Sequence, residues 1–159
     1  MHMPTLNLPR FNARLRTSAD QTEIFDEFRK KQVRLTPEEW VRQHLLHYLI
    51  GELGYPKARL AVEKSISLNK MTRRYDAVIF DESGHNPILL IECKAPEIAI
   101  NQQVFDQTAR YNQVLDVQFF LISNGLNHYF AFVDKTAGRY RHFEEIPNWA
   151  MFTKLLTTV

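Results

Sequence analysis

Two carboxylates and a lysine lie at strand ends, where their side chains can act together. Asp76 stands near the start of the apolar segment 75–80, and Glu92 and Lys94 follow a run of four apolar residues. Alternate side chains of a strand point to the same side, so Glu92 and Lys94 point together and Cys93 points into the interior. Carboxylates of this kind hold Mg²⁺, which polarises a phosphodiester and lowers the pKa of a bound water. Lys94 can orient that water or stabilise charge on the phosphate.

The apolar run 88–91 makes this pattern informative. A Glu-x-Lys triplet alone is weak, because both residue types are common. Asp76 and Lys94 could also form a simple surface pair worth about 0–1 kcal/mol. However, the run is typical of a buried strand, and charges placed directly after it are costly unless they have partners. The context therefore favours a site over a surface pair.

The elements that position these residues are predicted from periodicity and capping. A helix is expected over 36–51, with Thr36 as its N-cap, and a second helix over 101–115. Strands are expected at 60–68, 75–80, 88–93, 117–123 and 129–133, with a further short strand at 140–143. The order α-β-β-β-α-β-β predicts an α/β (α+β) fold with a mixed central sheet flanked by helices.

The length of 159 residues fits one domain. Residues 1–35 are predicted to form an N-terminal arm and a short helix at 20–34, because Ile24, Phe25 and Phe28 fall on one side of such a helix. The core is expected over 36–145. Residues 146–159 are expected to form a helical C-terminal tail.

Composition excludes several classes of protein. The net charge of +2 argues against a strongly basic nucleic-acid coat, and the single cysteine excludes an internal disulfide and a cysteine-rich zinc site. The five glycines form neither a GxxxxGK[ST] loop nor a GxGxxG fingerprint, so no nucleotide cofactor is expected. Apolar runs shorter than about 18 residues and the absence of an apolar leader predict a cytoplasmic protein with no membrane contact.

Charge is uneven along the chain. Residues 57–74 are mainly basic and residues 75–107 mainly acidic. This distribution indicates either two solvated faces or a polyanion-binding surface beside a cation site. Arg73 and Arg74 precede Asp76 and are candidate nucleic-acid contacts through phosphate. Because adjacent strand residues point to opposite sides, at most one of the two is expected to face the site.

Taken in order, these segments resemble the PD-(D/E)xK nuclease superfamily. Asp76 and the triplet Glu92-Cys93-Lys94 match its motif, with Tyr75 in place of the loosely kept proline. More specifically, the chain resembles the N-terminal nuclease domain of type I restriction enzyme R (motor) subunits. The resemblance runs from about residue 36 to 133, and is carried by residues 36–43, 74–81, 90–96, 107–112 and 124–125.

The resemblance implies a restriction-endonuclease-like core that uses Mg²⁺ or Mn²⁺. By resemblance, Asp76 and Glu92 bind the metal together with the backbone carbonyl of Cys93, and Lys94 is the catalytic lysine. Gln107 matches the start of a QxxxY element on the second helix.

Tyr111 matches the end of that element. Gln107 and Tyr111 share a helix face, and the resemblance implies that they contact a nucleotide or the catalytic lysine; ordinary helix packing is the alternative. The family also implies a glutamate from the first helix. Glu39 is the first choice, although it also completes a capping box. Glu38 is the alternative, because it lies on the apolar stripe that faces the sheet.

The expected activity is that of a stand-alone, Mg²⁺-dependent endodeoxyribonuclease, which hydrolyses phosphodiester bonds with inversion at phosphorus. No translocase is expected, because the chain is too short to contain one. The expected partners are nucleic acid, with DNA first, and a separate subunit or a second copy. The alternative is a catalytically silent module on the same fold that binds nucleic acid or protein, which the nearly neutral charge favours.

Overall fold

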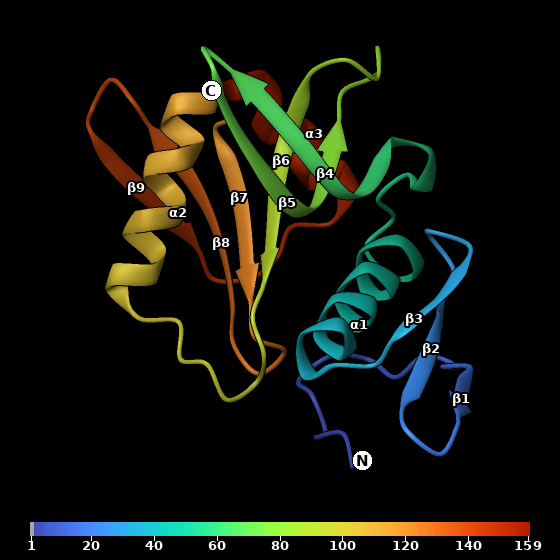
Figure 1. Ribbon diagram of the computed structural model, residues 1–159. Helices are drawn as coiled ribbons and strands as arrows, with labels where there is room; N and C mark the ends of the chain where they lie inside the picture. Colours follow the sequence, from blue (N-terminus) through green and yellow to red (C-terminus); the bar gives the residue numbers. More distant parts are fainter. Residues whose placement is uncertain (1) are drawn as a thin grey trace.

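The computed structural model describes residues 2–159, and the side chains of all of these except Tyr111, Gln113 and Val114. A six-stranded mixed sheet forms the centre of the molecule (Figure 1). Its strands, in spatial order, are β4 (Leu60–Leu68), β5 (Met71–Phe80), β6 (Pro87–Cys93), β7 (Phe119–Ser123), β8 (His128–Asp134) and β9 (Arg139–Phe143). β6 and β7 are parallel, because α2 (Gln102–Leu115) crosses over between them; the other neighbours are antiparallel.

Helices cover both faces of this sheet. α1 (Pro37–Gly51) and α3 (Trp149–Thr158) pack on one face, and α2 packs on the other (Figure 1). α1 begins as expected, since the Thr36 hydroxyl accepts the backbone N–H of Glu39 at 3.1 Å. A single 3₁₀ turn, Lys57–Arg59, leads into β4. The predicted fold class, a mixed sheet flanked by helices, is confirmed.

The two apolar layers explain the hydrophobic pattern of the strand sequences. Leu89 and Ile91 of β6 face α1 and α3, whereas Leu90 faces α2. Since both faces of β6 are covered, the strand is a continuous apolar run up to its last two residues. The expected strand at 140–143 and the expected C-terminal helix are both present. In the described residues, no helix is long and apolar enough to cross a membrane.

The short helix expected at 20–34 is wrong. This segment forms β2 (Thr22–Asp26) and β3 (Lys31–Arg34), which join β1 (Leu15–Thr17) in a separate three-stranded antiparallel sheet beside α1 (Figure 1). Turn chemistry at Asp26 overrides the helical spacing of the apolar residues, because its carboxylate accepts the backbone N–H groups of Phe28 and Arg29.

The pairing between β5 and β6 ends in the middle of β5. Its second half pairs with β6 from Ala77 onward, whereas its first half pairs with β4 alone. The strand bends at this point (Figure 1). Ala77 pairs with Ile91, so Asp76 and Glu92 are the next residues along the two strands. The fork between the strands therefore positions the two carboxylates.

Candidate active site

Asp76 and Glu92 converge at this fork. The backbone N–H of Cys93 donates to Oδ2 of Asp76 at 2.7 Å. Glu92 is only 8% exposed, and its Oε1 has no hydrogen-bond partner among the described residues. A buried carboxylate oxygen without a partner is costly in a folded protein. It is therefore a group to which a cation can bind favourably.

Burial also makes the charged forms of these two carboxylates unfavourable. Burial, followed by the negative charge of Asp76, raises the pKa of Glu92 to about 7. Burial also raises the pKa of Asp76, although the Cys93 N–H and the Arg42 guanidinium act in the opposite direction. A nearby cation would favour the charged form of both groups.

Lys94 lies beside these carboxylates. Its backbone N–H donates to the carbonyl of Ser123 on β7 at 2.8 Å, which ties the end of β6 to its parallel neighbour. Against the effect of burial, its charge lowers the pKa of Asp76 and of Glu92. The Cys93 side chain points into the core, as expected. The role of its carbonyl as a metal ligand stays a prediction.

The two helix glutamates differ in their surroundings. Glu39 is 5% exposed, its Oε1 accepts from Arg29 at 2.6 Å and from Gln43 at 3.1 Å, and its Oε2 lies 3.3 Å from Arg42. The side chain of Glu38 is 47% exposed. Burial and then the charge of Asp76 raise the pKa of Glu38, and its own charge helps to raise the pKa of Glu92.

Arginines bind the carboxylates on one side of the site. The Arg42 guanidinium lies 3.0 Å from Glu63 Oε1 and 3.4 Å from Asp76 Oδ1. Arg29, from the turn after β2, lies 3.0 Å from Glu63 and also contacts Glu39. Sequence reasoning missed Arg29 and Arg42 as site residues. The spacing of Arg42 three residues after Glu39 was the one available signal.

The predicted nucleic-acid contacts lie in different surroundings. Arg73 is 4.0 Å from Glu92 Oε2, and the largely exposed Arg74 forms an ion pair with Glu63. Gln107 is exposed on α2, and no hydrogen bond joins it to the carboxylates within the described part of the chain. The side chain of Tyr111 lies outside the described residues.

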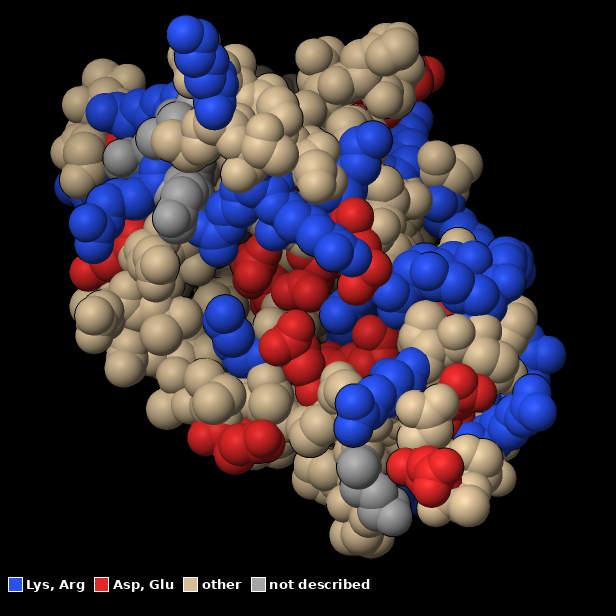
Figure 2. Space-filling model, in the orientation of Figure 1, with Lys and Arg blue, Asp and Glu red and all other residues tan. Residues whose placement is uncertain are grey.

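Figure 2 shows acidic side chains gathered in the middle of one face with Lys and Arg around them. This position corresponds to the C-terminal end of β6 and the start of α1 (Figure 1). Among the described residues, no group of three or more His, Cys, Asp or Glu is arranged as a metal cage. The pair Asp76 and Glu92 still fits Mg²⁺, which keeps several waters and takes one or two carboxylates together with substrate phosphate.

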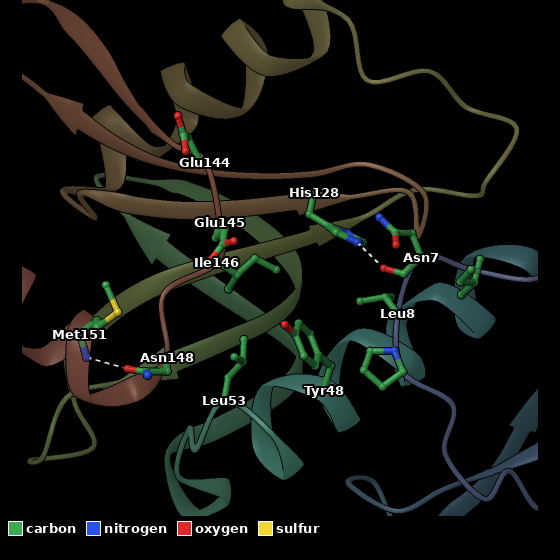
Figure 3. A pocket seen from close by; sticks show the side chains of 12 residues that line it. Asn7, Leu8, Tyr48, Leu53, His128, Glu144, Glu145, Ile146, Asn148 and Met151 are labelled. Carbon is green, nitrogen blue, oxygen red and sulfur yellow. Dashed lines mark hydrogen bonds between the residues drawn. The ribbon is translucent and has the colours of Figure 1, made fainter.

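A pocket of about 610 Å³ lies elsewhere, between the N-terminal segment, the end of α1 and residues 144–151 (Figure 3). His128 points toward Asn7 there, and its Nε2 lies 2.9 Å from the Asn7 carbonyl oxygen. No residue of the carboxylate site lines this pocket.

The mixed sheet, its parallel central pair and its helical layers define a nuclease-like α/β fold. Two solved structures share it. The fragment of a presumed HsdR subunit of a type I restriction enzyme from Vibrio vulnificus YJ016 superposes with a TM-score of 0.54 at 19% identity, over 77% of this chain and 25% of that chain. A presumed nuclease belonging to DUF820 from Anabaena variabilis ATCC 29413 superposes with a TM-score of 0.50 at 11% identity, over 87% of both chains.

The chain belongs to the family described as type I restriction enzyme R protein N terminus, whose model matches residues 37–147. The match begins with α1 and ends after β9, so it covers the whole six-stranded sheet. The chain spans 25% of the length of the Vibrio structure. Comparison with curated proteins gives no match.

Proposed function

We propose that this chain is a metal-dependent nuclease that hydrolyses phosphodiester bonds, with DNA as its substrate. One observation carries the proposal: Asp76 and the buried, unpartnered Oε1 of Glu92 meet beside Lys94. The family supports a nucleic-acid substrate, because restriction enzymes act on DNA.

Asp76 and Glu92 are the residues that would hold Mg²⁺ or Mn²⁺. When bound, the cation supplies a polarised phosphate and a water of lowered pKa. The Cys93 N–H and the Arg42 guanidinium hold Asp76 in place before substrate arrives. Lys94 places a positive charge where negative charge develops on the phosphate, which is the general way in which fixed cations accelerate such reactions.

Glu38, rather than the first choice Glu39, is the helix carboxylate of this proposal. The side chain of Glu38 is about half exposed and lies 4.0 Å from Arg42, so it can accept hydrogen bonds from water at the site, and its charge acts on Asp76. Both oxygens of Glu39 face cationic or donor groups of the protein itself. Glu39 is therefore assigned to positioning Arg42, which in turn lies against Asp76.

Nicking of supercoiled plasmid DNA with Mg²⁺ or Mn²⁺ tests the proposal. We expect Asp76→Asn and Lys94→Ala to lower the rate by at least about 100-fold, the usual range for losing one charge-stabilising or acid–base group. Glu145→Gln serves as the matched control, since Glu145 is exposed and lines the pocket of Figure 3. Equal nicking by the wild type and both site variants would contradict the proposal.

A catalytically silent binding module is the second candidate, and one observation favours it. Arg42 and Arg73 already place positive charge next to Asp76 and Glu92, at 3.4 Å and 4.0 Å. If these guanidinium groups satisfy the carboxylates, no divalent cation is required. Salt-sensitive DNA binding without Mn²⁺ binding would support this candidate.

A further inference from the structure

The first half of β5 and the second half of β4 form a two-stranded ribbon, defined here as Lys64–Tyr75. Its pairs run from Lys64 with Tyr75 to Leu68 with Met71, and β6 does not continue the pairing beyond Ala77. The ribbon begins at the fork that holds Asp76 and extends away from it across the front of the sheet (Figure 1). Any molecule lying on this ribbon is thus directed toward the carboxylates.

The two faces of the ribbon differ in chemistry. Ile66 packs against the apolar layer under α2. The opposite face carries small hydroxyl residues and one arginine, all exposed: Ser65, Ser67, Thr72 and Arg74. The hydroxyls of Ser67 and Thr72 lie 2.6 Å apart across the strands. Short side chains allow close approach, and hydroxyl groups donate to phosphate oxygens. One nitrogen of the Arg74 guanidinium pairs with Glu63, and an arginine has further N–H groups that can donate to phosphate.

At the tip of the ribbon, Lys70 adopts a backbone conformation that is unfavourable for a residue with a side chain. Asn69 and Lys70 both have positive φ, 49° and 65°. A two-residue hairpin turn of this shape strongly favours glycine at the second position, because a side chain there is strained. Lys70 is exposed and forms no salt bridge in the described part of the chain. No ion pair among the residues that the structure describes therefore accounts for a lysine at this position.

From this we infer that the outer face of the ribbon, with Lys70 at its tip, binds the sugar-phosphate backbone of a DNA duplex and leads it to the carboxylates. The inference rests on the proposed function for the identity of the ligand. A two-stranded ribbon is also an element that a duplex accommodates in its major groove. Figure 2 shows basic side chains along the region of the ribbon, directly next to the acidic cluster. Phosphates can lie on the basic side while the reacting one reaches the acidic side.

Duplex binding without cleavage tests the inference. The anisotropy of a short fluorescein-labelled DNA duplex is measured in EDTA at several salt concentrations. We expect Lys70→Gly to weaken binding and to reduce the slope of log K against log salt by about 0.9, the loss of one phosphate contact. Lys70→Gly together with Arg74→Gln should roughly double this change and weaken binding by about tenfold or more.

Lys70→Gly separates binding from folding, because glycine suits the turn and should leave the thermal midpoint equal or higher. Lys70→Arg should keep the binding of the wild type. Lys154→Gln, an exposed lysine on α3 behind the sheet, removes the same charge away from the ribbon. Equal losses in Lys70→Gly and Lys154→Gln, or no duplex binding by the wild type at low salt, would overturn the inference.

Asp76→Asn separates this inference from the proposed function. It should still bind the duplex, because Asp76 lies beyond the ribbon (Lys64–Tyr75) and the change removes a negative charge that repels phosphate. If the ribbon variants lose duplex binding and the wild type does not cut DNA, the result supports the ribbon as a DNA-binding surface and contradicts the proposed nuclease activity. If the wild type cuts DNA and the ribbon variants bind and cut it equally well, the result supports the nuclease activity and contradicts the ribbon as a DNA-binding surface.

Discussion

The backbone N–H of Cys93 donates a 2.7 Å hydrogen bond to Oδ2 of Asp76. This bond joins the two predicted strands at the point where they part. It places the Asp76 carboxylate between the sequence neighbours of Cys93, namely Glu92 and Lys94. A motif spread over two strands thus becomes one site through a single main-chain contact.

Glu92→Gln should change how stability depends on pH. Burial and the charge of Asp76 raise the pKa of Glu92 to about 7 in the folded protein, from an ordinary value of 4.5. Folding therefore favours the protonated form, so this contribution to stability is fully present below pH 4.5 and is lost as pH rises through about 7. Without metal, Glu92→Gln should be more stable than the wild type at pH 8 by up to roughly 3 kcal/mol.

Urea unfolding in EDTA at pH 5 and pH 8 measures this effect. The difference between variant and wild type should grow as pH rises. Glu145→Gln provides the control, since it alters an exposed carboxylate. The account of Glu92 is wrong if Glu92→Gln and the wild type show the same change in free energy of unfolding between the two pH values.

Glu38→Gln and Glu39→Gln should differ in kind. Glu38 is half-exposed beside Asp76, so Glu38→Gln should lower the rate of DNA cleavage and leave the free energy of unfolding within about 0.5 kcal/mol. Glu39 pairs with Arg29 and Arg42 while buried, so Glu39→Gln should destabilise the protein by about 2–4 kcal/mol. Cleavage assays and urea unfolding of both variants measure this difference. If Glu39→Gln instead slows cleavage without loss of stability and Glu38→Gln does not slow it, Glu39 is the helix carboxylate of the site.

Arg29→Met should loosen the small sheet. Arg29 contacts the buried Asp26 and Glu39, and its loss leaves both carboxylates short of a partner. We expect a loss of about 3 kcal/mol in stability and faster hydrogen exchange in β2 and β3. Arg16→Met is the matched control, because Arg16 is exposed on β1. Similar exchange in both variants would show that Arg29 does not hold this sheet.

Gly125→Ala should be more harmful than Gly84→Ala. Both glycines have positive φ, 82° and 75°, so alanine is strained at either position. A Cβ at Gly125 would also lie 2.7 Å from Leu6 Cδ2 and 3.0 Å from Val41 Cγ2, whereas the space at Gly84 is open. We expect Gly125→Ala to lower the thermal midpoint further, by about 2–4 °C for each additional kcal/mol, in scanning calorimetry. Equal midpoints would mean that the N-terminal segment moves aside without cost.

Much of the fold could be predicted from local signals. The apolar run 88–91 and the cap at Thr36 were sufficient for β6 and α1, because burial on both faces and capping leave direct marks in the sequence. The helix predicted at 20–34 was wrong, because the apolar spacing of this segment fits a helix whereas the turn at Asp26 determines its structure.

The site was predictable only in part. The proximity of Asp76 to Glu92 followed from a hairpin of two predicted strands. The arginine network did not, since Arg29 and Glu63 are far apart in sequence and their pairing depends on how the small sheet packs. The choice between Glu38 and Glu39 depends on the same network, so it required the structure.

Calorimetric titration with Mn²⁺ at pH 8 tests the central claim most directly, because it requires neither DNA nor turnover. The account predicts saturable binding to the wild type and its loss in both Asp76→Asn and Glu92→Gln, each shown to be folded by circular dichroism. The absence of binding to the wild type, or binding that survives unchanged in both variants, would contradict a metal site at Asp76 and Glu92.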